Sequence, residues 1–476
     1  MNFLSDHSYN FKTIGRFAAG NFSLKRTISL LEFKNLYSHC IQKDLEKIMH
    51  FGICTYGSRG DTQPYIALAL GLKSRGHVIT LFANENFSGM ITCYNIDFCP
   101  LPGDMEEVVH SPEVLGILRS GNMIRFLREL QKVGRKFQPA ANAAMLKGAS
   151  GVDVLVASPL AMIWVYSIAE KLGKKWAVVQ LSLPTVPTRE FPFAGLSFFD
   201  FSLYNIFTYK LIHSIYWKLN KKDVNGHRAL LGLPALKTPI QKKMNAQKIL
   251  NLYALSPSLI SRPDDWPDEV QLTGFFAISQ SQRIAGGNEE PDAKLIEWLA
   301  AGAPPIYIGF GSIPIPDTDR FSGILHELLD NTNERIIFCQ GWSELPDLPR
   351  HENLFAVKAI NHEWLFPRCK AAVIHGGIGT LAAVLHAKIP AIVVSIFGDQ
   401  PIWGKFIQQK DLGVHIPFKK LTTKKLLDAI EISQMAQVKH NANIMGEKLQ
   451  NEDGVTTGVE MLEKYFGTLS QPAQLT

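Results

Sequence analysis

The sequence predicts an α/β protein built from two doubly wound domains. In both halves of the chain, short apolar runs of buried-strand type alternate with helix-compatible segments, which is the pattern of β-α-β units with parallel strands. A length of 476 residues is sufficient for two such domains. In the C-terminal half, a glycine-rich turn between a strand and a helix indicates a ligand site at the carboxyl edge of the sheet.

The first half opens with an apolar run, a polar turn, a helix-compatible segment and a second apolar run, which together predict a β-α-β unit. The turn at Gly57–Pro64 is not a dinucleotide fingerprint, because its two glycines lack the Gly-x-Gly-x-x-Gly spacing and no acidic residue closes the second strand. Strands are expected at 49–56, 78–82, 96–101, 152–157, 176–181 and 270–275, with helical segments between them.

The second half follows a polar run at 279–291 that has the composition of an interdomain linker. Helices are expected at 292–301, 381–386, 422–432 and 454–465, and strands at 306–312, 335–339, 354–357, 371–374 and 391–396. The predicted division is an N-terminal extension at 1–48 without a catalytic role, a first domain at 49–257, a linker region at 258–291 and a second domain at 292–476.

The glycine turn His375–Thr380 follows an apolar run and precedes a helix-compatible segment. Its glycines allow backbone amides to approach an anion, and the N-terminus of the next helix carries partial positive charge. Many turns of this kind serve packing alone, so the turn by itself leaves phosphate binding and packing open. About 20 residues on, a second apolar run ends in Gly398–Pro401. Asp399 and Gln400 there suit the vicinal hydroxyls of a sugar, or they cap the following helix.

Asp61 stands near the carboxyl end of the first strand, where it would face a ligand held by the second domain. A carboxylate in that place can take a proton from an acceptor hydroxyl. The alternative is a helix cap, because Asp61 precedes a helix-compatible segment.

Together, His-Gly-Gly-x-Gly-Thr and Gly-Asp-Gln-Pro at this spacing resemble the nucleotide-sugar signature of the GT-B glycosyltransferases. The resemblance is strongest to the branch of sterol glucosyltransferases and bacterial enzymes acting on macrolides, glycopeptides and carotenoids, and it extends from Met49 to about Phe466. It implies two Rossmann-like domains facing across a cleft, with the last helix crossing back to the first. The family often has a second histidine where Ile374 stands and Ala or Ser where Ile378 stands, so the donor fit beside Ile378 is open.

The resemblance also implies the activity: an inverting, metal-independent transfer of a hexose, favoured as glucose, from a UDP-sugar to a hydroxyl of a hydrophobic acceptor, with no cofactor. Asp61 is the implied catalytic base. The residues implied to bind the donor come from five segments: Ser58, Arg59, Ser312, Ala359, Ile360, His362, His375, Gly376, Gly377, Ile378, Gly379, Thr380, Asp399 and Gln400. The rival interpretation is a non-catalytic GT-B protein that binds a nucleotide or activates a partner.

The stretch 190–217 is crowded with aromatic residues and broken by Pro192 and Asp200, which makes it unsuited to a membrane span. It is interpreted as a packed core edge, as an apolar acceptor pocket, or as a patch that meets lipid. The resemblance implies an acceptor site here, for a sterol, a carotenoid, a polyketide or another lipid alcohol.

A net charge of +6, half of it within residues 1–48, argues against nucleic acid as a partner. The six cysteines form no Cys-x-x-Cys pair and no zinc-ligand spacing, and three of them (Cys54, Cys339 and Cys369) lie in or beside apolar runs. Residues 1–48 lack a secretory signal pattern, although their mix of Lys, Arg, Ser and Phe is compatible with a weak transit peptide. A cytoplasmic location, with peripheral membrane contact as an option, is therefore expected, and the oligomeric state is left without a prediction.

Overall fold

The computed structural model describes residues 48–120, 123–287, 292–343 and 345–468. Apart from Ile48, the described residues belong to one compact unit that begins at Met49. The expected N-terminal extension lies outside the described residues except for Ile48. In the part of the chain that is described, no helix combines the length and the apolar character that a bilayer span requires.

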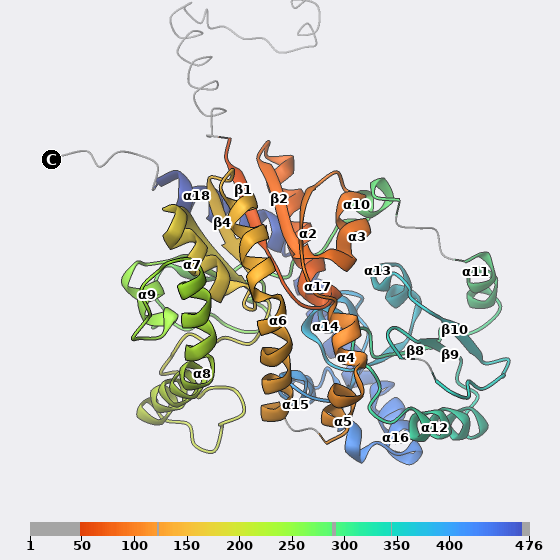
Figure 1. Cartoon of the computed structure of the whole chain (residues 1–476). Helices are drawn as coiled ribbons and strands as arrows, with labels where there is room; N and C mark the ends of the chain where they lie inside the picture. Colours follow the sequence, from red (N-terminus) through yellow and green to blue (C-terminus); the bar gives the residue numbers. More distant parts are fainter. Residues whose placement is uncertain (1–47, 121–122, 288–291, 344, 469–476) are drawn as a thin grey trace, which may run out of the picture. The chain divides into compact units, whose positions relative to one another are not determined.

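Two parallel sheets organise the unit from Met49 onward, which confirms the predicted α/β class (Figure 1). The first sheet has the order β3-β2-β1-β4-β5-β6-β7 and the second β10-β9-β8-β11-β12-β13, so each reverses direction beside its first strand, as a doubly wound sheet does. The strands of the first sheet are β1 (His50–Cys54), β2 (Val78–Asn84), β3 (Asp97–Leu101), β4 (Val154–Ala157), β5 (Lys175–Gln180), β6 (Asn251–Tyr253) and β7 (Val270–Leu272). Those of the second are β8 (Ile306–Gly309), β9 (Ile336–Cys339), β10 (Leu354–Val357), β11 (Ala371–Ile374), β12 (Ala391–Ser395) and β13 (Gly413–Pro417).

Helices connect the strands in both halves. In the first half they are α2 (Arg59–Ser74), α3 (Ser88–Thr92), α4 (Met105–His110), α5 (Pro112–Ser120), α6 (Met123–Ala149), α7 (Met162–Leu172), α8 (Ser202–Leu230), α9 (Ile240–Ala246) and α10 (Gln280–Ala285). In the second they are α11 (Ala293–Ala300), α12 (Thr318–Asp330), α13 (His362–Leu365), α14 (Ile378–His386), α15 (Gln400–Gln409), α16 (Thr423–Ser433), α17 (Ala436–Gln450) and α18 (Gly454–Thr468). Strand β7 falls in the region 258–291 that the sequence assigns to the linker, yet it is the edge strand of the first sheet.

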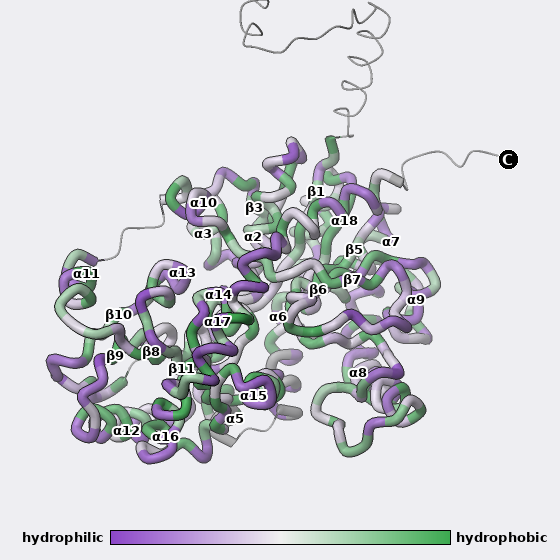
Figure 2. Tube along the Cα trace, turned by 180° about the vertical axis from the view of Figure 1, so that it is seen from behind, coloured by the Kyte–Doolittle hydropathy of each residue, from purple (hydrophilic) through white to green (hydrophobic). Residues whose placement is uncertain are grey.

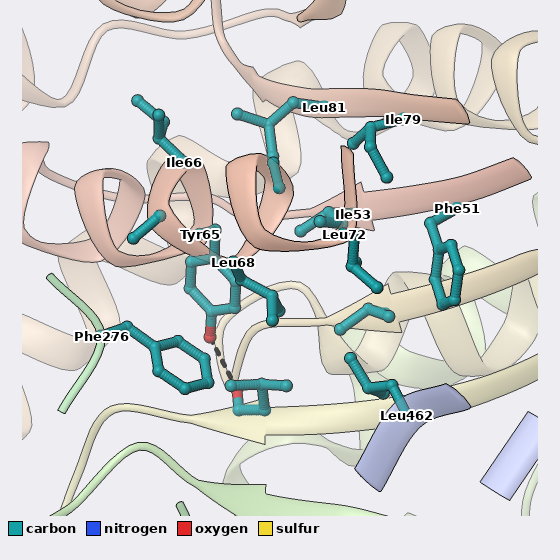
Figure 3. Close-up of a cluster of buried hydrophobic side chains, with 14 of the residues drawn as sticks. Phe51, Ile53, Tyr65, Ile66, Leu68, Leu72, Ile79, Leu81, Phe276 and Leu462 are labelled. Carbon is teal, nitrogen blue, oxygen red and sulfur yellow. Dashed lines mark hydrogen bonds between the residues drawn. The ribbon is translucent and has the colours of Figure 1, made fainter. Parts of the chain in front are cut away.

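The first core forms between α2 and the strands beneath it (Figure 3). Tyr65, Leu68 and Leu72 repeat at helical spacing along α2 and are fully buried against Phe51 and Ile53 of β1. The hydroxyl of Tyr65 donates to the backbone oxygen of Val179 at 2.6 Å, which satisfies the one polar atom of this side chain. This packing fixes α2, and therefore the loop at its N-terminus, on the sheet.

The last helix, α18, belongs to the same core, because Val459, Leu462 and Phe466 are buried in it. At its edge His77 Nε2 lies 3.0 Å from Glu463 Oε1. The C-terminal end of the described chain is therefore packed on the N-terminal sheet.

A small apolar cluster also joins the two halves at another point. Val109, Val114 and Ile117 of α4 and α5 pack with Trp342 and Phe397 from the second half. His110 Nε2 lies 2.7 Å from the backbone oxygen of Trp342. We call this cluster the clasp.

Candidate active site

A cleft of about 1980 Å³ lies between the two sheets and is lined by residues of both halves. The N-terminal wall includes residues 58–61, 63–65, 158–160, 162, 180–183 and 185–187 with Phe193, Ile212, His213 and Tyr216. The C-terminal wall includes residues 311–313, 358–363, 377–380 and 397–400 with His375. The carboxyl ends of β1, β4 and β5 face those of β8, β11 and β12, which is where open α/β sheets bind ligands.

Asp61 lies on the N-terminal wall as the third residue of α2. Its Oδ2 accepts from the backbone N–H and from the hydroxyl of Ser58, both at 2.8 Å. The sequence left open that Asp61 caps α2, but the N-cap residue is Ser58. Asp61, three residues further on, bonds back to Ser58 as in a capping box. Because both bonds end on Oδ2, Oδ1 is left without a donor among the described residues.

The pKa of Asp61 is raised by burial, against the lowering effect of the Ser58 hydrogen bonds, and is raised further by the negative charge of Asp399. The charge of Asp399 acts from the opposite wall. A carboxylate with a raised pKa is a stronger base than an exposed one, so its position and its basicity both suit proton abstraction.

The loop before α2 has two features that hold Asp61 in place. Gly57 has φ +135°, and a Cβ on it would lie 2.5 Å from Asp61 Oδ2. Asn84, which is fully buried at the end of β2, accepts from the N–H of Gly57 at 3.0 Å and donates to the oxygen of Gly103 at 2.7 Å. Sequence reasoning missed Asn84, whose only signal is a polar residue at a strand end.

The glycine turn opens α14, with Gly377 at the N-cap. The amides of Ile378, Gly379 and Thr380 form the first turn of this helix, where backbone N–H groups have no acceptor within the helix. All three residues line the cleft. The turn therefore presents donors and the positive end of a helix dipole to the cleft.

His375 precedes the turn and is buried, with its Nδ1 unpaired among the described residues. Burial lowers its pKa to about 4, so the imidazole is neutral at pH 7 and has one N–H to donate. Gly376 is the one predicted donor residue that does not line the cleft. It has φ +90°, and a Cβ on it would lie 2.5 Å from Val393 Cγ1, so it shapes the turn from behind.

Asp399 and Gln400 both line the cleft at the start of α15. Trp403 Nε1 donates to Asp399 Oδ2 at 2.9 Å, which orients the carboxylate, and burial raises its pKa. Gln400 Oε1 accepts from the amides of Ile396 and Phe397 at 2.8 and 3.1 Å. Asp399 occupies the N-cap position of α15 but makes no side-chain capping bond. The side-chain oxygen of Gln400 holds the loop before the helix, so the NH₂ group of Gln400 remains as a free donor among the described residues.

The segment Ala359–His362 lines the cleft beyond β10, and Ser312 lines it after β8. His362 Nε2 lies 3.0 Å from the hydroxyl of Tyr307. Its pKa is lowered to about 3, first by burial and then by the positive charge of Arg59. Arg59 is on the N-terminal wall, so its guanidinium acts across the cleft. Trp364, by contrast, is off the cleft and packs against Arg368, whose guanidinium lies 4.3 Å from the ring centroid.

The aromatic stretch contributes less to the cleft than its composition suggests. Of its aromatic residues, only Phe193 and Tyr216 line the cleft. Much of the other apolar lining in this half comes from the segments at 158–162 and 180–187, whose lining role sequence reasoning did not single out, and from Met90, Phe276 and Ile278. His213 Nε2 lies 2.9 Å from the backbone oxygen of Thr185 and ties α8 to this loop. Within the described ranges, no group of three or more His, Cys, Asp or Glu side chains is arranged to hold a metal ion.

Two doubly wound domains facing across a cleft, with a helix N-terminus on one wall and a buried carboxylate on the other, define the GT-B class of glycosyltransferases. A calicheamicin glycosyltransferase has a similar fold, with a TM-score of 0.61 and 17% identity over 89% of this chain and 100% of its own. Residues 51–191 match the model of the glycosyltransferase family 28 N-terminal domain. Residues 324–453 match that of the erythromycin biosynthesis protein CIII-like C-terminal domain.

The chain is 32% identical over 440 residues to a sterol 3-beta-glucosyltransferase of Arabidopsis thaliana, which covers 90% of this chain and 68% of the relative. It is 31% identical over 431 residues to a sterol 3-beta-glucosyltransferase of Debaryomyces hansenii, covering 87% of this chain and 26% of that relative. The chain thus spans about a quarter of the length of the yeast protein. The chain belongs to the sterol glucosyltransferase family of the UDP-glycosyltransferases and is an enzyme.

Proposed function

We propose that this enzyme transfers glucose from UDP-glucose to the hydroxyl of a sterol or a similar lipid alcohol, with inversion at the anomeric carbon and without a metal ion. The observation that carries the proposal is the placement of Asp61 and the N-terminus of α14 on opposite walls of one cleft. An acceptor on one side and a donor on the other then meet between a base and an anion site.

The C-terminal wall has a group for each part of the donor. The amides of Ile378, Gly379 and Thr380 would bind the diphosphate, with Ser312 beside them. Asp399 and the NH₂ group of Gln400 would bind hexose hydroxyls, since a carboxylate accepts and an amide donates. The segment Ala359–His362 would receive the uracil. Ser58 and Arg59 reach the diphosphate from the N-terminal wall.

In the proposed displacement, Asp61 takes the proton of the acceptor hydroxyl as its oxygen forms a bond to the anomeric carbon. The bond from that carbon to the diphosphate oxygen breaks on the opposite face, and UDP leaves. Negative charge grows on the diphosphate during this step, where the positive end of α14 and the guanidinium of Arg59 stabilise it. Because His375 is neutral, it would contribute a hydrogen bond and no charge.

The N-terminal wall supports a hydrophobic acceptor. Leu160, Met162, Leu183 and Val186 line the cleft on the same side as Asp61. The Arabidopsis and Debaryomyces relatives are named for transfer to the 3β position of sterols, and this chain shares about a third of its residues with each. A flat alcohol with one terminal hydroxyl fits a wall of this kind.

Incubation of the purified protein with UDP-glucose and a panel of sterols, carotenoid alcohols and flavonoids tests the proposal by mass spectrometry. A sterol product with one added hexose is expected, and the coupling constant of its anomeric proton gives the configuration. Product from flavonoids alone would contradict the proposed acceptor class. The absence of both sugar transfer and donor hydrolysis would favour a non-catalytic role. Activity lost in EDTA and restored by magnesium would contradict metal independence.

A further inference from the structure

Helix α8 leaves a stripe of apolar side chains exposed along its N-terminal half. On its inner side Asn205 and Thr208 are buried, and both bond to the preceding loop. Its outer side carries Leu203, Phe207, Leu211 and Ile215, which are spaced by four residues and so lie on one face. Leu203 is 82% and Phe207 56% exposed. An amphipathic helix in water normally turns this stripe toward the core.

The loop before α8 enlarges the apolar surface. Phe198, Phe199 and Phe201 are all exposed, at 76%, 63% and 55%. Phe199 and Tyr204 meet edge to face with ring centroids 5.3 Å apart, and the hydroxyl of Tyr204 donates to the oxygen of Leu196 at 2.9 Å. The loop is therefore held in shape while its rings face outward. Figure 1 shows α8 with this loop at the lower left, and Figure 2 shows hydrophobic colouring along parts of the loop.

We propose that this surface, made of the loop at 198–201 and the outer face of α8, docks on an anionic lipid bilayer. The positive charge beside the apolar stripe favours an anionic lipid surface over other partners for this face. Exposed Lys210, Lys218, Lys221 and Lys222 lie on α8 beside and beyond the apolar stripe, and no Asp or Glu occurs from Phe201 to Lys222. Asp200 is engaged by Asn205 Nδ2 at 2.9 Å. Apolar side chains next to lysines are the composition of helices that lie in the membrane interface.

The same helix borders the cleft. Ile212, His213 and Tyr216 of α8 line it, one helical face away from the exposed stripe. A bilayer under α8 would lie next to the N-terminal wall. The docking on a bilayer does not depend on the proposed function. The entry route does rest on the proposed function: a lipid alcohol would pass from the bilayer into the cleft without crossing water.

Co-sedimentation with vesicles tests the docking, using phosphatidylcholine alone and equimolar phosphatidylcholine and phosphatidylserine. The wild-type chain is expected to bind the mixed vesicles more tightly. Leu203→Ser with Phe207→Ser should weaken binding by about tenfold or more, because two inserted side chains are removed. Lys218→Gln with Lys221→Gln should reduce the preference for the anionic vesicles by about fivefold for each lysine.

The matched control is Ile284→Ser with Ile296→Ser, which removes two apolar residues of 67% and 46% exposure on α10 and α11. It should bind vesicles as the wild type does, and unchanged melting temperatures would show that all variants fold. A wild-type chain that ignores vesicles, or equal losses in both apolar double variants, would overturn the proposal. A wild-type dimer that Leu203→Ser with Phe207→Ser converts to a monomer would overturn it too, by making a second copy the occupant.

Transfer assays separate docking from catalysis. Leu203→Ser with Phe207→Ser should lose rate toward a sterol embedded in mixed vesicles and keep it toward the same sterol in detergent micelles. Loss in both media would contradict the entry route. If no sterol is glucosylated at all, the proposed function fails while vesicle binding still decides the docking.

Discussion

The C-terminal wall of the cleft presents the N-terminus of α14 and the loop with Asp399 and Gln400, whereas the N-terminal wall places apolar side chains such as Leu160 and Leu183 on the same side as the buried carboxylate of Asp61. The first draws on compact turns at the ends of β8, β11 and β12. The second combines segments near residues 60, 160, 185 and 213. A site for a phosphate needs amides held by a local turn, and a site for a hydrophobic molecule needs only surface, which any segment can supply.

The most severe test of this division is Asp61→Asn. Turnover should fall by on the order of 10²–10⁴, as expected when a general base is lost, while UDP binding persists because the C-terminal wall is intact. Single-turnover assays and UDP titration measure the two. Asp317→Asn is the control, because Asp317 caps α12 through the amide of Arg320 at 3.1 Å away from the cleft. Equal losses in both variants would reduce Asp61 to a helix-capping role.

The pH dependence of kcat/KM should reflect the ionisation of Asp61 on the N-terminal wall. A base must be deprotonated, and the pKa of Asp61 is raised by burial, so activity should begin to fall at a higher pH than for an exposed carboxyl. Below that pKa the loss approaches about tenfold per pH unit. His375 and His362, with pKa values lowered to about 4 and about 3, should add no step between pH 6 and 8. An acid limb that is retained in the Asp61→Asn variant would point to another group instead.

Gly377→Ala probes the C-terminal wall alone. A Cβ there would overlap Nε2 of His375, so the turn must shift and its amides lose alignment. The Kd for UDP should rise by about tenfold, equivalent to one hydrogen bond or slightly more. Gly323→Ala serves as control, because nothing lies within 4 Å of its Cβ. Unchanged UDP affinity, measured by calorimetry, would remove this turn from the donor site.

The smallest effect is expected on the apolar side. Leu160→Ala should raise the KM for the acceptor by about threefold to tenfold and leave the KM for the donor unchanged, because a few methyl and methylene groups of contact are lost. Ile284→Ala, an exposed aliphatic truncation off the cleft, should change neither constant. A rise in the KM for the donor would show that the two walls do not divide the substrates as described.

The sequence predicted most strands because buried parallel strands are continuous apolar runs, and β11 and β12 show this plainly. It missed β6, which is three residues long, and β13, which begins with glycine and ends with proline. It also left the aromatic stretch without a helix, because Pro192 and Asp200 conceal that α8 starts just after them, at Ser202. Which side chains of that stretch face the cleft, the core or the solvent depends on tertiary contacts, and no local sequence pattern encodes these contacts.

The predicted donor residues of the second half, apart from Gly376, lie on one wall for a local reason: each follows a strand end, and parallel strands bring their ends to one edge. The apolar lining at 158–162 and 180–187 has no such signature, since leucine, valine and proline are common in any loop. Asn84 is hidden for a related reason, because its importance lies in its contact with Gly57 across 27 residues.

The clasp has a mechanical consequence for turnover. Phe397, one of its apolar members, precedes Asp399 by two residues and gives its amide to Gln400. A hinge motion that parts the two halves must therefore withdraw Phe397 from Val109, Val114 and Ile117, and it would pull on the loop that carries Asp399 and Gln400. Opening of the cleft and displacement of the Asp399–Gln400 loop are therefore mechanically coupled through Phe397.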